Sequence, residues 1–431
     1  MPKKKDDKPK KAALSQAAAP AQDPKRQAMV DRMAKARATR QANIAAAKKA
    51  PAAKNAPAAS AKAPAAALAQ ARNTRNSAPA RQQLPEVLGI GIIGAGGIAR
   101  GVHIPGYQKL ANAQVLAVSD PVQVAREGVA QQFGIEDAYA DFHEMLKRDD
   151  IHAVSVTTPN FLHAEAAIAA LEAGKHVLCE KPLAMNVREG EAMVEASRRT
   201  GRKLMCGFNY RFSPEVQALK RFAEAGEFGE MYYARTQALR RRGIPSWGMF
   251  ISKEKNGGGP LIDIGVHMLD ATMHVLGFPK PISVSGKTWQ MFGKRPDVLG
   301  LMGQWDHENF TVEDFAIAQV RFETGAVLTL ESSFVANLEE ADKMSFQIFG
   351  SQGGCSYNPL KMFKEEHKTL LDITPVHLPR NVQTHHEEIK SFVNSILNDE
   401  PVYTPGEQAV EITRIIDAIY ASSESGKEVI F

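Results

Sequence analysis

The chain has 431 residues, enough for two domains, and its charge is unevenly distributed. Residues 1–85 carry 19 Lys and Arg against 4 Asp and Glu, a net charge of +15 with no aromatic residue, whereas the remainder carries 34 against 44, a net charge of −10. The formal net charge of +5 is therefore the sum of a basic segment and an acidic remainder, so the protein is not uniformly basic. The lack of any run of about 18 uncharged apolar residues excludes a membrane-spanning helix.

The basic segment, residues 1–85, is rich in Lys, Ala, Pro and Gln, and it has too little apolar surface to offset the entropy of ordering. We therefore expect this segment to be disordered. Residues 24–50 are a candidate marginal helix, because Asp23 and Pro24 supply an N-cap and a first helical position. Two interpretations of the segment remain open: weak, salt-dependent contact with nucleic acid or another polyanion, or a solvated extension without a partner.

The N-terminus lacks the continuous apolar core of a signal peptide, because its lysines are followed by interrupted alanine runs. The three cysteines, Cys179, Cys206 and Cys355, are odd in number and far apart, without the spacing of a metal site. These features predict a cytoplasmic protein with reduced thiols, no membrane association and no metal.

From Val87 onward, apolar runs alternate with helical segments such as 159–174. The strand-like runs are residues 87–94, 113–120, 152–158, 175–180 and 202–208. This alternation predicts βαβ units, right-handed crossovers and a parallel sheet. We expect an α/β, Rossmann-type NAD-binding domain over residues 86–211.

After about residue 212, strand-like segments follow one another among Gly and Asn turns, without obvious helices between them. These segments are 230–240, 282–292, 313–322, 326–334 and 344–350. They predict an α+β domain over residues 212–431, with an open-faced, mostly antiparallel sheet. Two late helices, at about 383–397 and 405–424, are expected to close the chain and are candidates to pack back on the first domain.

A glycine-rich turn follows the first predicted strand. Gly94, Gly96 and Ala99 form G-x-G-x-x-A, in which the first Gly permits a tight turn and the second lets the backbone approach a pyrophosphate. The helix that begins near Gly97 and Ile98 offers free N–H groups to the phosphates.

The next strand ends in Asp120, 21 residues after Ala99, where a carboxylate is placed to accept hydrogen bonds from the ribose hydroxyls. No Arg immediately follows Asp120 to receive a 2′-phosphate. The pattern predicts a site for NAD in preference to NADP. A glycine turn required only for packing is the alternative.

Two further stretches carry titratable residues. CEKPLA places Glu180 and Lys181 at the carboxyl end of the predicted fifth strand, the edge where open α/β sheets bind ligands. GGGPLIDIGVHMLD spaces Asp263, His267 and Asp270 so that a helix starting near Asp263 would place all three on one face. Each stretch also has a purely structural interpretation. In the first, Lys181 is a surface lysine in a turn; in the second, Asp263 is a helix N-cap and His267 a core histidine.

Five stretches together resemble the glucose-fructose oxidoreductase and inositol dehydrogenase (Gfo/Idh/MocA) family. They are GIIGAGGIA, TTPNFLHAE, GKHVLCEKPLA, GFNYRFSP and GGGPLIDIGVHMLD. The resemblance covers residues 87–431. It implies NAD(P)-dependent oxidation or reduction of sugars, polyols and related alcohols, and an open C-terminal sheet often used for dimer or tetramer contacts.

The resemblance also implies roles for individual residues. Lys181 matches the family's catalytic lysine, and Asp263 and His267 match its acidic residue and histidine beside the substrate. Tyr210 and Arg211 match a position between the domains. The residues expected at the cofactor are Gly94, Gly96, Gly97, Ile98, Asp120, Thr158, Pro159, Asn160, His163, Glu180 and Lys181.

The stretch RRRGIPSWGMF, residues 240–250, resembles one branch of the family. Arg240 offers a planar fork to sugar hydroxyls or carboxylates, and the indole of Trp247 offers a face for a pyranose ring. Packing of Trp247 against a neighbouring subunit is the alternative.

The favoured function is an NAD-dependent sugar or polyol dehydrogenase or reductase. In that mechanism His267 takes the hydroxyl proton, Lys181 stabilises charge on the reacting oxygen, and Asp263 orients His267 and the substrate; the roles of Lys181 and His267 are interchangeable on sequence alone. A glycosidase that oxidises its sugar transiently on NAD, and a non-catalytic dinucleotide sensor, are the alternatives.

Overall fold

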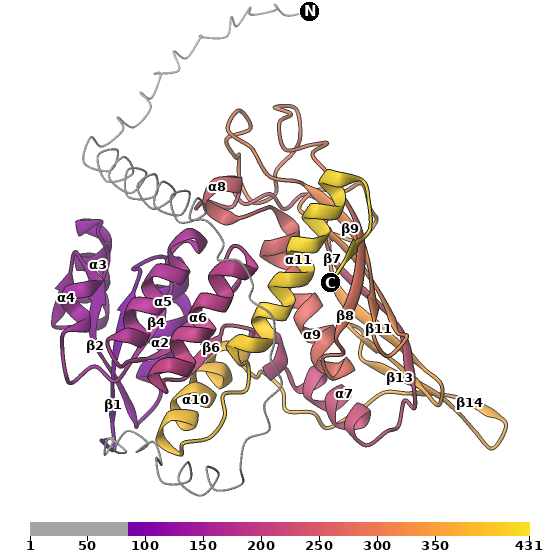
Figure 1. Cartoon of the computed structure of the whole chain (residues 1–431), viewed down its shortest axis with the longest axis horizontal. Coiled ribbons are helices and arrows are strands. Elements are labelled where there is room, and N and C mark those ends of the chain that lie inside the picture. The colour runs from indigo at the N-terminus through magenta and orange to yellow at the C-terminus, as the bar shows by residue number, and fades with distance from the viewer. Residues whose placement is uncertain (1–84) are drawn as a thin grey trace, which may run out of the picture. The chain divides into compact units, whose positions relative to one another are not determined.

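The computed structural model describes residues 85–431. The predictions for the basic segment, including the helix at 24–50 and the polyanion contact, lie outside the described residues. The described chain begins with a six-stranded sheet in the order β3-β2-β1-β4-β5-β6, in which every neighbouring pair is parallel. A Rossmann-like domain is thus confirmed (Figure 1).

The strands of this sheet are β1 (Leu88–Ile93), β2 (Ala113–Ser119), β3 (Asp137–Tyr139), β4 (Ala153–Val156), β5 (His176–Cys179) and β6 (Leu204–Cys206). The connecting helical segments are η1 (Ala99–His103), α2 (Ile104–Gln108), α3 (Gln123–Phe133), α4 (Phe142–Leu146), η2 (Asn160–Leu162), α5 (His163–Glu172), α6 (Val187–Thr200) and η3 (Asn209–Phe212). All five strands expected in this domain are present. The sixth, β3, has three residues and no apolar run to predict it.

The second sheet has nine strands in the order β14-β13-β12-β11-β7-β10-β9-β8-β15. These are β7 (Met231–Arg240), β8 (Pro281–Trp289), β9 (Phe315–Phe322), β10 (Val327–Ser333), β11 (Asp342–Gly350), β12 (Gly354–Tyr357), β13 (Lys361–Glu366), β14 (Thr369–Ile373) and β15 (Val429–Ile430). Only β7 and β10 pair in parallel, so the sheet is mostly antiparallel, as expected.

The helices of the second domain are α7 (Pro214–Glu224), α8 (Lys253–Asn256), η4 (Leu261–Gly265), α9 (Val266–Leu276), α10 (Thr384–Leu397) and α11 (Gly406–Ser425). The expectation of strands without helices between them was wrong, because α8, η4 and α9 all lie between β7 and β8. Nearly every residue of η4 and α9 is buried, so their sequence lacks the alternation of apolar and polar faces that marks a surface helix.

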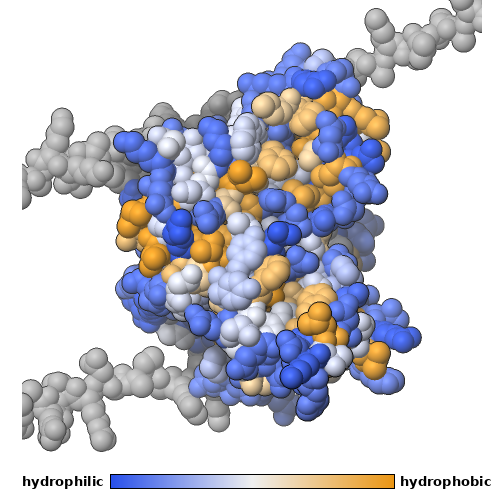
Figure 2. Space-filling model, turned by 90° about the vertical axis from the view of Figure 1, so that its right-hand side faces the viewer, coloured by the Kyte–Doolittle hydropathy of each residue, from blue (hydrophilic) through white to orange (hydrophobic). Residues whose placement is uncertain are grey.

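In the described chain, helices cover one face of this sheet (Figure 1). Helix α9 lies against β7, where the hydroxyls of Thr236 and Thr272 are 2.9 Å apart. Helix α11 packs so closely on β8 that a Cβ built on Gly286 would lie 2.8 Å from Ile419. The other face carries apolar patches among hydrophilic residues (Figure 2).

Helix α10 follows the second sheet in sequence but packs into the core of the first domain. Ile389 and Phe392 belong to one buried cluster with Ile90 and Tyr107. A Cβ on Gly106 would lie 2.5 Å from Ile389, so this glycine permits the close approach of α10. In residues 85–431, no helix has the length and apolar character to cross a membrane.

Candidate functional site

Lys181 joins the two domains. It follows β5, and its Nζ donates to the carbonyl oxygen of Asp263 at 2.8 Å and to Asp263 Oδ1 at 2.9 Å. The Lys181–Pro182 peptide bond is cis. An ammonium group has three protons, so one remains available after both bonds to Asp263 are made. This arrangement holds a charged hydrogen-bond donor at the carboxyl edge of the parallel sheet.

His267 lies on the first turn of α9, beside this pair. Its ring centroid is 5.3 Å from that of Tyr210, and its Nδ1 is buried without a hydrogen-bond partner among the described residues. Burial is the main cause that lowers the pKa of His267 well below 6.5, and the charge of Lys181 adds to it. His267 is therefore neutral near pH 7 and able to accept a proton.

The expected convergence of Asp263, His267 and Asp270 on one helix face was wrong for Asp270. Asp263 lies in the π-turn η4, whose wider hydrogen-bonding pattern changes the direction of the following side chains relative to a regular α-helix. Asp270 has no exposed surface, and its Oδ2 accepts a hydrogen bond of 2.9 Å from Arg211 Nε. It neutralises a buried guanidinium and does not face the Lys181–Asp263 pair.

Arg211 is 1% exposed and lies in the interior. Besides its two bonds to Asp270, it donates to the carbonyl of Tyr403 at 3.2 Å and stacks over Phe278, 4.8 Å from the ring centroid. The structure therefore does not bring Arg211 to the site surface. Its neighbour in the sequence, Tyr210, does reach the site through its contact with His267.

The glycine-rich turn has the open geometry that a dinucleotide needs. Gly94 has φ of +103°, and a Cβ there would lie 2.7 Å from the carbonyl oxygen of Thr157. Gly96 and Gly97 are exposed, and a Cβ on either would meet no atom within 4 Å. The amides that open η1, from Gly97 and Ile98, precede the helical carbonyls that could bond them, so they suit a pyrophosphate.

Asp120 organises the same turn. Its Oδ2 accepts from the amide of Ala95 at 2.9 Å, and its Oδ1 accepts from the amide of Val122 at 2.8 Å. A carboxylate has about four acceptor positions, so ribose hydroxyls can still be bound. Thr158 Oγ1, on the loop after β4, is buried without a partner in the described chain, which also fits a ligand at this edge.

The loop after β4 is braced on both sides. His163 lies within hydrogen-bond distance of the carbonyl oxygens of Pro182, at 2.8 Å, and Thr158, at 2.9 Å. Asn160 Nδ2, which follows Pro159, donates to the carbonyl and side-chain oxygens of Asn256, both at 2.9 Å. Because His163 has no exposed surface, it holds the loop from the interior of the domain.

Glu180 connects the loop after β5 to η1. Its Oε1 lies 2.8 Å from His103 Nε2, and its Oε2 accepts from the amide of Lys181 at 3.1 Å. Burial opposes ionisation, but the hydrogen bond and charge of His103 outweigh it and lower the pKa of Glu180. His103 Nδ1 lies 3.0 Å from Ser155 Oγ, which continues the buried network.

Two residues of this environment were not among the sequence predictions. His103 is carried by η1, four residues after Ala99, and only its spacing from the glycine turn could have suggested it. His385 lies on the first turn of α10, where burial mainly lowers its pKa and the charges of Glu180, His103 and Lys181 also act on it. No sequence signal places His385 here, because α10 is about 200 residues away from β5 along the chain.

Arg240 is the last residue of β7. Thr236, four residues earlier, contacts Thr272 of α9, and alternate strand residues share a face, so Arg240 is on the face of the sheet that carries α9. Its charge helps to lower the pKa of His267, although burial is the main cause. Its Nη1 has one backbone acceptor, Gly243, at 3.4 Å. Trp247 is 55% exposed on the following loop, free to contact a ligand or a neighbouring subunit.

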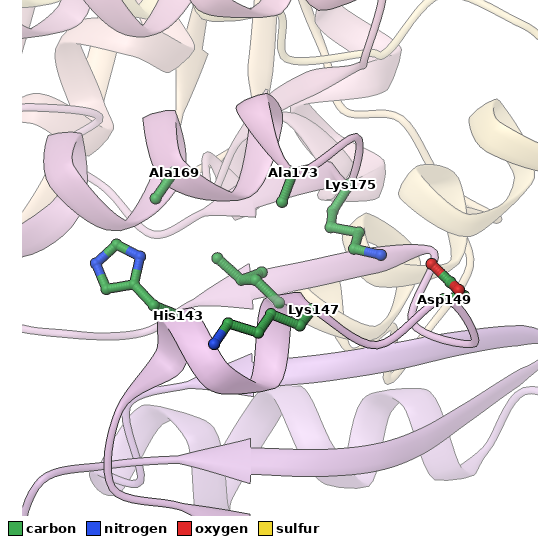
Figure 3. Close-up of a pocket in the computed structure, with 7 residues that line it drawn as sticks. His143, Lys147, Asp149, Ala169, Ala173 and Lys175 are labelled. Carbon is green, nitrogen blue, oxygen red and sulfur yellow. The ribbon is translucent and has the colours of Figure 1, made fainter.

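A separate hollow of about 350 Å³ lies between α4 and the end of α5 (Figure 3). It is lined by His143, Leu146, Lys147, Asp149, Ala169, Ala173 and Lys175. None of the predicted site residues lines it. The residues with catalytic chemistry are at the carboxyl edge of the sheet instead.

Comparison with known proteins identifies the family of both domains. Residues 88–208 match the profile described as the oxidoreductase family, NAD-binding Rossmann fold, and residues 220–431 match that of the oxidoreductase family, C-terminal alpha/beta domain. The D-glucoside 3-dehydrogenase of Escherichia coli is 35% identical, over 79% of this chain and 97% of its own. The myo-inositol 2-dehydrogenase of Thermotoga maritima is 26% identical, over 74% of this chain and 91% of its own.

Among solved structures, levoglucosan dehydrogenase in complex with NADH and levoglucosan superposes with a TM-score of 0.70. It is 26% identical to this chain, and the match covers 80% of this chain and 99% of the other.

Proposed function

Because the chain belongs to the Gfo/Idh/MocA oxidoreductase family, with its NAD-binding Rossmann domain, we propose that it oxidises a secondary hydroxyl of a pyranose sugar or polyol. The observation that carries the proposal is the pair of bonds from Lys181 Nζ to Asp263, beside a neutral His267. The turn at 94–98 and Asp120 would hold NAD, which would supply the hydride acceptor when bound.

The protein's own groups then have distinct tasks. The Lys181 ammonium group donates its third N–H to the reacting oxygen and stabilises the negative charge that develops there. Neutral His267 accepts the hydroxyl proton in oxidation and returns it in reduction. Asp263 holds the ammonium group at its position, so the donor is fixed before the substrate arrives.

The substrate class follows from the relatives and from two side chains. The relative named D-glucoside 3-dehydrogenase acts, by its name, at position 3 of a glucoside. In this chain Tyr210 contacts His267, and the charge of Arg240 acts on it, while Trp247 is exposed on the loop after β7. A guanidinium group suits sugar hydroxyls, and an indole face suits a pyranose ring. We propose glucosides and related pyranoses as the first substrates to test.

The test is a panel of sugars, polyols and glycosides with NAD, followed by NADH absorbance. Net NADH formation supports the dehydrogenase, whereas release of an aglycone without net NADH supports the glycosidase. His267→Ala and Lys181→Ala are each expected to lower kcat by about 10²- to 10⁴-fold with little change in NAD affinity. Lys147→Ala, at the exposed residue that follows α4, is the control, and near-normal turnover in both site variants would contradict the mechanism.

We also expect a homo-oligomer formed through the helix-free face of the second sheet. Ile317 is 40% exposed there, and the rings of Trp289 and Phe315 lie 5.9 Å apart. Light scattering would measure the mass in solution. The thiols of Cys179, Cys206 and Cys355 are buried and form no disulfide, which fits a cytoplasmic location.

A further inference from the structure

The loop that precedes Asp263 is unusually crowded. Residues 257–259 are three consecutive glycines between α8 and η4. A Cβ on Gly258 would lie 1.9 Å from the hydroxyl of Tyr420, and a Cβ on Gly259 would lie 2.1 Å from the carbonyl oxygen of Glu313. The glycines are therefore required by the approach of α11 and of the segment before β9.

Glu313 and Tyr420 form a brace on this loop. Glu313 Oε2 accepts from the amide of Gly259 at 2.9 Å, and its Oε1 accepts from the amide of Leu261 at 3.2 Å and from the Tyr420 hydroxyl at 2.9 Å. Glu313 is 8% exposed, so these three donors replace water around its carboxylate.

The braced loop determines where the partner of Lys181 lies. The amide of Asp263 donates to the carbonyl of Gly259 at 3.1 Å, within the first turn of η4. Lys181 Nζ bonds both the carbonyl oxygen and Oδ1 of Asp263. A shift of the loop backbone therefore moves both acceptors of the ammonium group together.

We propose that Glu313 and Tyr420 are positioning residues, which act on catalysis by holding the loop that places Asp263 against Lys181. The inference rests on the proposed function. Glu313 bonds the loop amides and Tyr420 bonds Glu313, so the effect of both residues reaches Lys181 through Asp263. A misplacement of about 1 Å at a reacting group can cost about 10²-fold in rate, so the brace has a measurable effect on turnover.

Glu313→Gln is the sharpest variant. It keeps the shape of the side chain but replaces one acceptor oxygen with a donor, and in either orientation one loop amide loses its acceptor. We expect kcat to fall about 10- to 100-fold while the Kd for NADH stays within twofold. Tyr420→Phe leaves both amide bonds in place, and we expect a smaller fall, of about 3- to 10-fold.

Matched controls use the same substitutions elsewhere. Glu428→Gln alters a carboxylate that accepts from Ser283, and Tyr139→Phe removes a hydroxyl bonded to Arg148. Both controls are expected to keep kcat within about twofold, as surface changes away from the loop do.

A double-mutant cycle separates positioning from general stability. In an Asp263→Asn background, measured by single-turnover NADH formation, Glu313→Gln should lose most of its effect, because the residue through which it acts is already altered. Hydrogen exchange of residues 257–266 should also rise in Glu313→Gln and in neither control. Normal kcat in Glu313→Gln, or an undiminished effect in the Asp263→Asn background, overturns the inference, whereas absence of sugar oxidation by the unaltered protein overturns the proposed function.

Discussion

At the scale of single residues, the buried His176 shows how burial and nearby charges set the pKa of a side chain in the first domain. His176, the first residue of β5, accepts a hydrogen bond from the amide of Lys203 at its Nδ1, at 3.0 Å. Burial, and then the charges of Arg202 and Lys203, lower the pKa of His176 to about 3. The imidazole is therefore neutral in the folded protein at every ordinary pH.

The depressed pKa of His176 has a definite consequence for stability. Between pH 6.5 and about 3 the unfolded chain protonates this residue while the folded chain does not, so folding stability falls as pH falls through this window. His176→Asn retains an oxygen acceptor but does not titrate. We expect the free energy of unfolding of the unaltered protein, relative to this variant, to decline by about 1.4 kcal/mol per pH unit below pH 6.

Urea unfolding at several pH values measures this difference. His143→Asn, on the exposed side of α4, is the control and should leave the pH dependence unchanged. Parallel pH profiles for the unaltered protein and His176→Asn would show that His176 is not neutral in the folded state.

Asp120 has two tasks that a pair of variants can separate. Its carboxylate holds the glycine turn through the amides of Ala95 and Val122, and we expect its charge to oppose a 2′-phosphate. Asp120→Ala should relax discrimination against NADP by about tenfold or more, equivalent to about 1.4 kcal/mol, and weaken NAD binding as well. Asp120→Asn, which keeps one acceptor oxygen, should relax discrimination with a smaller loss of NAD binding.

The kcat/KM ratio for NAD and NADP measures the choice of cofactor. An unaltered protein that already prefers NADP would contradict this interpretation of Asp120.

At the scale of elements, the π-turn η4 decides which acidic residue reaches the site. Regular α-helical spacing predicts that Asp263 and Asp270 share a face, but the wider first turn places Asp263 at Lys181 and leaves Asp270 in the interior with Arg211. The same interruption lets Lys181 bond both the carbonyl and the side chain of one residue.

Helix α10 shows that a C-terminal element stabilises the first domain. Phe392 has no exposed surface and lies in the cluster around Ile90 and Tyr107. Phe392→Ala should lower the free energy of unfolding by about 3 to 5 kcal/mol, because it removes a large buried ring and leaves a cavity. Leu370→Ala, at a position 85% exposed on β14, should change it by less than about 0.5 kcal/mol.

Chemical denaturation followed by circular dichroism measures both variants. A small effect of Phe392→Ala would mean that the first domain does not depend on α10 for its core.

At the scale of the whole molecule, residues 85–431 contain a large buried core and every candidate site residue named above. We therefore expect a chain that starts at Leu84 to fold, to bind NAD and to keep kcat/KM within about twofold, as changes away from the site do. It should lose whatever low-salt retention on heparin or DNA the full chain shows, because the +15 segment is removed. Loss of turnover would instead make the basic segment part of the enzyme.

Much of the architecture follows from local pattern. The strands β1, β2, β4, β5 and β6 appear where apolar runs predict them, because a strand buried on both faces must be apolar along its length. The glycine turn is equally local, since positive φ at Gly94 requires a residue without Cβ. The strands β3, β12, β13, β14 and β15 were not predicted, because they are short and their local patterns are weak.

The contacts that make a site out of these residues depend on tertiary structure. Lys181 and Asp263 are 82 positions apart and meet only because the second domain packs on the edge of the first sheet. Asp270 pairs with Arg211, and Glu313 pairs with the amide of Gly259, for the same reason. A buried charge or amide requires a hydrogen-bond partner, and the fold determines which partner is near. The sequence by itself determined the Rossmann domain, its glycine turn and the residue types of the candidate site, because these depend on local pattern. The packing of distant segments determined which of those residues lie together.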